Sequence, residues 1–97
     1  MPWGKKGDID AAITHYKTAI KINANYANTY NNLGAVLARQ ESLKEAITHY
    51  KTAIKIAPNF AKAYNNLGHA LGKKGDIDAA ITHYKTAIKI KPSYAKA

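Results

Sequence analysis

The sequence has no cysteine, and only six of its 97 residues are acidic. Without thiols the chain forms neither disulfides nor cysteine-ligated metal sites. No apolar run approaches the roughly 20 residues of a membrane-spanning helix, and residues 1–4 lack the form of a signal peptide. These absences predict a soluble, cytoplasmic protein with no membrane attachment.

Groups suited to catalysis are equally scarce. The two serines are Ser42, which fits a helix cap, and Ser93, which follows a proline, and neither has a plausible base as its partner. The segment Gly-Lys-Lys-Gly-Asp is too short for a phosphate-binding loop and lacks the Lys-Ser/Thr pair. We therefore expect no enzymatic activity, no catalytic residue and no cofactor.

What the chain does contain is repetition. The segment Ala-Ile-Thr-His-Tyr-Lys-Thr-Ala-Ile-Lys-Ile occurs unchanged at residues 12–22, 46–56 and 80–90, a spacing of 34 residues. A second segment, Tyr-Asn-Asn-Leu-Gly, occurs at residues 30–34 and 64–68 with the same spacing. Repetition at this period predicts one supersecondary unit that stacks on copies of itself.

Two kinds of helix follow from the apolar spacing. Over each identical segment and the turn before it, apolar residues recur at steps of three and four, as in Ile9, Ala12, Ile13, Tyr16, Ala19 and Ile20. We call these the B helices. The A helices are expected over residues 27–40 and 61–74, where an aromatic residue, Leu, Gly and a second Leu repeat the stripe. The chain is predicted to be all-α, with helix order B-A-B-A-B.

Polar residues and prolines indicate where the helices begin and end. Asp8 and Asp76 suit N-caps, and Ser42 with Glu45 has the form of a capping box. Pro58 and Pro92 cannot continue the helices that precede them. Gly34 and Gly68 each cost about 1 kcal/mol inside a helix relative to Ala, so we expect close backbone approach there. The matching small surface is expected from Ala46, Ala53, Ala80 and Ala87.

At these positions the chain resembles the tetratricopeptide repeat family. The family pattern is met by Tyr64, Leu67, Gly68, Leu71, Gly75, Asp76, Ala80, Tyr84, Ala87 and Pro92. The repeat sequences are most similar to those of the interaction arrays of bacterial proteins and of O-GlcNAc transferase. The middle unit departs at Glu41, where Gly is expected, and the first unit departs at Ala24, where Pro is expected. The resemblance implies antiparallel helix hairpins stacked as a right-handed superhelix.

Alignment by 34 residues divides the single domain, 1–97, into about two and a half repeats. Residues 4–26 form a truncated repeat with only the B helix, 27–60 and 61–94 are full repeats, and 95–97 begin a further helix that is cut off. Residues 4–22 and 72–90 are identical, which indicates recent duplication, excision or engineering. Because neither end carries a polar capping helix, we expect apolar terminal helices to self-associate as a homo-oligomer.

The central junction permits a second form of association. Residues 38–46 contain neither Gly nor Pro and are rich in helix-forming residues. A helix fused over about residues 27–56 would exchange halves between two chains and give a domain-swapped dimer. The alternative is an ordinary tight turn that uses the Ser42 cap.

The resemblance also implies a concave groove, lined by the A helices, that binds an extended peptide or a partner's helix. Asn32 and Asn66, two residues after the aromatic positions, are the residues implied to hold a peptide backbone. By helical spacing the same face is expected to include Asn28, Ala35, Arg39, Lys62, His69 and Lys73, with Asn31 and Asn65 beside it. Lys62 and Lys73 would make this face basic, so the expected ligand is an acidic peptide or a C-terminal carboxylate. Alternatively, the asparagine amides bond only to water or to a neighbouring helix.

The net charge of +9 raises nucleic acid as an alternative partner. Much of this charge has a structural explanation, because the acids fall at expected helix starts and many lysines near helix ends, where both complement the helix dipole. We therefore expect no nucleic-acid partner, and a fragment without a native ligand is the other alternative. His15, His49 and His83 recur at equivalent positions, but equivalent helices lie about 8 to 10 Å apart, too far for shared zinc ligation, so no metal site is expected.

Overall fold

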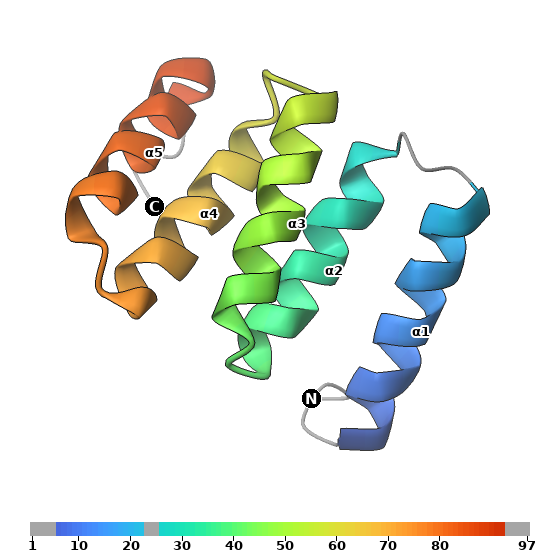
Figure 1. Ribbon diagram of the computed structural model, residues 1–97. Helices are drawn as coiled ribbons and strands as arrows, with labels where there is room; N and C mark the ends of the chain where they lie inside the picture. The colour runs from blue at the N-terminus through green and yellow to red at the C-terminus, as the bar shows by residue number, and fades with distance from the viewer. Residues whose placement is uncertain (1–5, 23–25, 93–97) are drawn as a thin grey trace.

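The computed structural model describes residues 6–22 and 26–92, and these residues form five helices and no strand. In chain order the helices are α1 (Lys6–Ile22), α2 (Ala27–Arg39), α3 (Leu43–Ile56), α4 (Ala61–Lys74) and α5 (Ile77–Ile90). They follow one another side by side, with α1 at one end of the array and α5 at the other (Figure 1). The all-α class and the helix order B-A-B-A-B are thus confirmed.

The core lies where the apolar stripes of successive helices meet. Leu33 and Leu67 are almost completely buried in α2 and α4, and Ile47 and Tyr50 of α3 pack between them in one cluster. Leu37 and Leu71 extend this cluster one turn further along the same two helices. The repeated Leu-Gly-x-x-Leu stripe therefore forms the contact between hairpins.

The two helical glycines lie against tyrosine rings. A Cβ at Gly34 would come within 2.7 Å of Tyr50 Cε1, and one at Gly68 within 3.0 Å of Tyr84. The carbonyl oxygens of Ala46 and Ala80 would lie 3.2 and 3.1 Å away, respectively. Close approach at the glycines was predicted correctly. The small surface was assigned to four alanines, whereas the contacting groups are two tyrosine rings and two alanine carbonyls.

The helix caps agree with the sequence at only one position. Asp76 caps α5, where its Oδ1 accepts a hydrogen bond from the Ala79 N–H at 3.4 Å. The prediction for Asp8 was wrong, because α1 already begins at Lys6 and Asp8 lies in its first turn. Ser42 precedes α3 but makes no side-chain cap bond, so the proposed capping box with Glu45 is absent from this helix start.

A tight turn joins α2 to α3, and the same turn joins α4 to α5. The Ser42 N–H donates to the Leu37 carbonyl at 2.9 Å, and the Asp76 N–H donates to the Leu71 carbonyl at the same distance. Such a bond back across the helix end is characteristic of a left-handed C-terminal cap. Gly75 supplies that cap with φ 101°, and Glu41 supplies it with φ 64°. In this chain residues 27–56 are therefore two helices and a turn, not the fused helix considered from the sequence.

Candidate functional site

Two adjoining hollows lie along one face of the array. The first, of about 150 Å3, lies between Tyr16 of α1 and residues of α2. The second, of about 230 Å3, lies between α2 and α4, with Tyr50 of α3 at its side. They share Ala35 and Arg39, so α2 forms the ridge between them. We call these two hollows together the groove.

The groove contains six of the ten side chains that the sequence placed there. These residues are Asn32, Ala35 and Arg39 from α2, and Asn66, His69 and Lys73 from α4. Each set recurs at steps of three and four residues, which places its members on one face of its helix. Two sequence-distant A helices thus present one polar surface above the leucine core.

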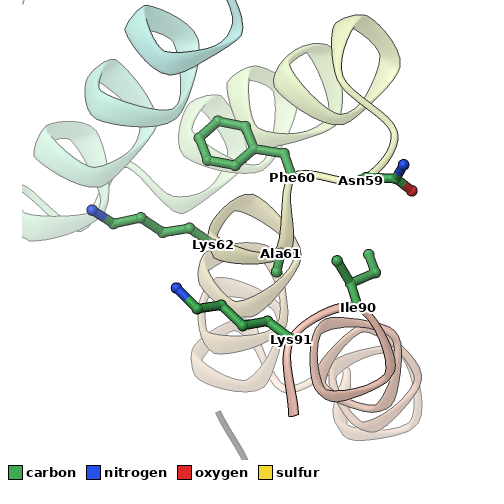
Figure 2. A pocket seen from close by; sticks show the side chains of 6 residues that line it. All are labelled: Asn59, Phe60, Ala61, Lys62, Ile90 and Lys91. Carbon is green, nitrogen blue, oxygen red and sulfur yellow. The ribbon is translucent and has the colours of Figure 1, made fainter. Parts of the chain in front are cut away.

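Four of the ten predicted residues do not line the groove. Asn28 is exposed near the start of α2, and Asn65 is half-buried in α4. Asn31 is only 1% exposed, because it faces α4 across the helix pair. Lys62 lines a separate hollow of about 370 Å3, where α4 begins and α5 ends. Figure 2 shows Lys62 and Lys91 extending to the same side of that hollow, below Phe60, with Ile90 on the other side.

A side-chain hydrogen bond joins the two A helices. Asn66 Nδ2 donates to Asn31 Oδ1 at 3.0 Å, in a partly buried position. This bond fixes the orientation of the Asn66 amide at the groove. The side-chain oxygen of Asn66 and the second N–H of its amide can still form hydrogen bonds. One asparagine of the predicted set is therefore a buried support for another.

The groove is cationic. Arg39 and Lys73 are exposed, and none of the described residues that line the two hollows is acidic. Lys73 is paired with Glu41 outside the hollows, with Glu41 Oε1 3.7 Å from Lys73 Nζ. With the side chains 45% and 72% exposed, such a pair contributes little to stability and is readily exchanged for another carboxylate.

Sequence reasoning missed the aromatic walls of the groove. Tyr16 and Tyr50 come from B helices, and their positions on apolar stripes had assigned them to packing alone. Burial raises the pKa of Tyr50 to about 12, so its phenol is neutral at physiological pH. No local sequence signal distinguishes these two tyrosines, because a stripe residue at the edge of a helix contact can be buried or can border a hollow.

The repeated histidines lie against the A-helix tyrosines. His49 stacks on Tyr30 with ring centroids 6.0 Å apart, and His83 stacks on Tyr64 at 6.1 Å. Burial lowers the pKa of both imidazoles, and Lys17 and Lys51 add to the effect at His49 and His83, respectively. Glu45 acts in the opposite direction at His49. Within the described ranges, no three His, Cys, Asp or Glu residues are grouped to hold a metal ion.

None of the helices that the structure describes is both long enough and apolar enough to cross a membrane. Residues 25–93 match a family profile described as Tetratricopeptide repeat, and residues 5–41 match one described as TPR repeat. No curated protein matches the chain.

Two solved structures of MamA are similar to the chain. One aligns with a TM-score of 0.84 and 34% identity over 93% of this chain and 53% of its own. The other aligns with a TM-score of 0.81 and 35% identity over 92% of this chain and 49% of its own. The chain thus spans about half the length of these structures, and its helical-repeat architecture is theirs.

Proposed function

The chain belongs to the tetratricopeptide repeat family, a family of protein-interaction scaffolds, and we propose that its groove binds an extended acidic peptide without catalysing a reaction. The observation that carries the proposal is the pair of adjoining hollows between α1, α2 and α4. Their described lining combines two cations with amide groups and has no acid. A peptide with acidic side chains would meet complementary charge along this surface.

The asparagines supply the backbone recognition in this proposal. Asn32 lines one hollow and Asn66 the other, and an amide side chain pairs with both the N–H and the carbonyl of a peptide unit. Asn66 is held by Asn31, so less side-chain entropy is lost when a peptide binds. Asn31 thus acts through Asn66. Asn28, Asn65 and Lys62 are proposed to contact residues of a peptide that extends beyond the two hollows.

Titration calorimetry with an extended peptide rich in Asp and Glu tests this function. Arg39→Glu and Lys73→Glu should each weaken binding by about three- to tenfold, because each replaces a complementary charge by a repulsive one. Lys55→Glu is the matched control, since it makes the same charge change at an exposed position on α3. If all three variants weaken peptide binding equally, net charge alone explains the loss of affinity, and a binding site in the groove is contradicted.

A single-stranded DNA titration at low and moderate salt forms the second arm of that experiment. A binding constant that falls steeply with salt would favour the nucleic-acid alternative over a peptide ligand. The peptide proposal instead predicts weak DNA binding that Lys55→Glu and Lys73→Glu reduce alike. A peptide of the same length rich in Lys should not bind.

We also propose that the chain self-associates through its terminal helices. Three isoleucines of α5 are markedly exposed, Ile77 at 56%, Ile81 at 45% and Ile88 at 37%. Covering such a surface is favourable at about 25 cal/mol per Å2. Domain swapping is a further form of this proposal, because straightening the chain at Glu41 would release its left-handed backbone. Measurement of the solution mass across concentration tests self-association in either form.

A further inference from the structure

Two helices with the same sequence have different surroundings in this molecule. Residues 46–56 of α3 and 80–90 of α5 are identical, yet Ile47 is 7% exposed and its equivalent Ile81 is 45% exposed. The difference arises from neighbours alone. Leu67 and Leu71 of α4 pack in one cluster with Ile47, and no described helix follows α5. The structure thereby shows that this stripe is suited to burial against another helix.

The uncovered stripe runs along most of α5. Ile77, Ile81, half-buried Tyr84 and Ile88 recur at steps of four, three and four residues, so they share one face. The side of the helix next to this stripe is committed to the array, because Ala80 and Ala87 are buried there and one edge of the Tyr84 ring lies against Gly68 of α4. Packing two such stripes together would remove apolar side chains of both from water.

Charge along α5 is separated by sign. Asp76 and Asp78 are exposed at its start, and Lys85 and Lys89 are exposed towards its end. A helix that lies antiparallel to an identical copy brings acids next to lysines at both ends of the contact. A parallel pair would instead bring the lysine-bearing ends of both helices together. The helix dipoles also favour the antiparallel arrangement.

We infer that α5 pairs antiparallel with α5 of a second copy of this chain, about a two-fold axis. This inference rests on the proposed self-association and names the surface that mediates it. One register of the two helices brings all four residues of the stripe into contact with the stripe of the second copy. With Ile77 opposite the second copy's Ile88, Ile81 lies opposite its Tyr84, and the same pairs recur by symmetry. In that register Asp78 lies between the second copy's Lys85 and Lys89, within one helical turn of each.

Disulfide cross-linking tests the register directly, because the chain has no native cysteine. Chains carrying Ile77→Cys are mixed with chains carrying Ile88→Cys under mild oxidation. The mixture should cross-link rapidly, since the two thiols face each other. Either variant alone should cross-link slowly, because its thiols lie about 16 Å apart along the helix axes, beyond disulfide reach. Equal rates for the mixture and for the single variants would overturn the antiparallel register.

Sedimentation equilibrium of the 97-residue chain tests the surface. The unmodified chain should reach twice its 10.6 kDa mass at high concentration. Ile81→Glu should raise the dimer dissociation constant by roughly tenfold or more, because it places a carboxylate at the centre of the contact. The matched control is Thr82→Glu, an exposed neighbour outside the stripe, which should leave the constant nearly unchanged. Far-UV circular dichroism confirms that both variants remain helical.

The remaining outcomes separate this inference from the proposals on which it rests. If Ile81→Glu stays dimeric, the α5 surface is wrong and self-association through another contact stands. If the unmodified chain is monomeric at every concentration, both assembly proposals fall. In either case peptide binding in the groove is unaffected, because none of its lining residues belongs to α5.

Discussion

Tyr50 and Tyr84 occupy the space that Gly34 and Gly68 leave open in the A helices. Gly34→Ala should lower the free energy of unfolding by about 1 to 3 kcal/mol, because the new methyl group meets Tyr50 Cε1 at 2.7 Å and the Ala46 carbonyl oxygen at 3.2 Å. Gly68→Ala should cost less, since Tyr84 is only half-buried and its ring can shift, whereas Tyr50 is 3% exposed. Urea denaturation measures both values.

Gly72 provides the matched control for these glycines. A Cβ there would lie 3.7 Å from the Ala80 Cβ, an ordinary contact. Gly72→Ala should therefore raise the free energy of unfolding by up to about 1 kcal/mol through helix propensity alone. If Gly34→Ala and Gly72→Ala change stability alike, the tyrosine contact does not explain the glycine at position 34.

His49 and His83 make stability depend on pH. Burial lowers the pKa of both side chains below the ordinary 6.5, so the unfolded chain binds protons more readily than the folded chain. Stability should be complete above pH 6.5 and should fall as the pH drops below it. Urea midpoints between about pH 7.5 and about pH 5 measure this loss.

The double variant His49→Gln with His83→Gln should flatten that pH profile. His15→Gln removes an exposed imidazole from the same repeat position and serves as the matched control. An unchanged slope in the double variant would show that carboxylates or other groups carry the pH dependence.

The residue contacts that sequence reasoning could not predict are those between repeats. Sequence reasoning placed Asn31 in the groove because it lies beside Asn32. In the structure Asn31 is buried and its side chain accepts a hydrogen bond from Asn66. Neighbouring positions on a helix point in directions about 100° apart. A groove residue and a buried one therefore differ by a single step in the chain. Only the position of α4 decides which amide faces solvent.

At the scale of elements, the α2–α3 turn places Glu41 in the left-handed backbone region at φ 64°. Glu41→Gly should raise the free energy of unfolding by about 1 kcal/mol, since glycine adopts this conformation without a Cβ penalty. The exposed ion pair with Lys73 that is lost contributes little. Gly75→Ala, at the equivalent turn with φ 101°, should destabilise by a similar amount. Denaturant midpoints that move the other way would contradict the shared turn geometry.

The helix α1 should be the least stable element. None of its residues over positions 7–19 is buried, whereas α2, α3 and α4 each have several buried residues. Amide hydrogen exchange should be faster in α1 than in α3, although residues 12–22 and 46–56 are identical. Equal protection of the two segments would show that sequence, not neighbouring helices, determines their stability.

Most element boundaries could be predicted because they depend on local signals. Pro58 and the stripe from Tyr64 to Leu71 predicted a helix over 61–74, which is the observed α4. The helix expected over 27–40 ends at Arg39, since Gln40 belongs to the turn. The caps at Asp8 and Ser42 were wrong. The reason is that α1 starts before Asp8, and the Ser42 carbonyl, not its side chain, bonds to the Ala46 N–H.

At the scale of the whole molecule, the 34-residue period predicted the stacking of helices and hence one shared polar face. Of the six groove residues, Asn32 and Asn66 were implied by the family resemblance, and the other four follow from helical spacing along the same face. The aromatic walls formed by Tyr16 and Tyr50 do not follow from it, because a stripe residue at the edge of a helix contact can be buried or can border a hollow. The packing angle between helices makes that difference, and no local sequence signal encodes it.

The central claim is that the groove between α1, α2 and α4 binds an acidic peptide. The most direct test is an NMR titration of the isotopically labelled chain with such a peptide. Shift changes should concentrate at Asn32, Arg39, Asn66, His69 and Lys73, with little change at Thr48 and Thr82 on the exposed faces of the B helices. Changes that map instead to the B-helix faces, or no changes at saturating peptide, would contradict the groove as the binding site.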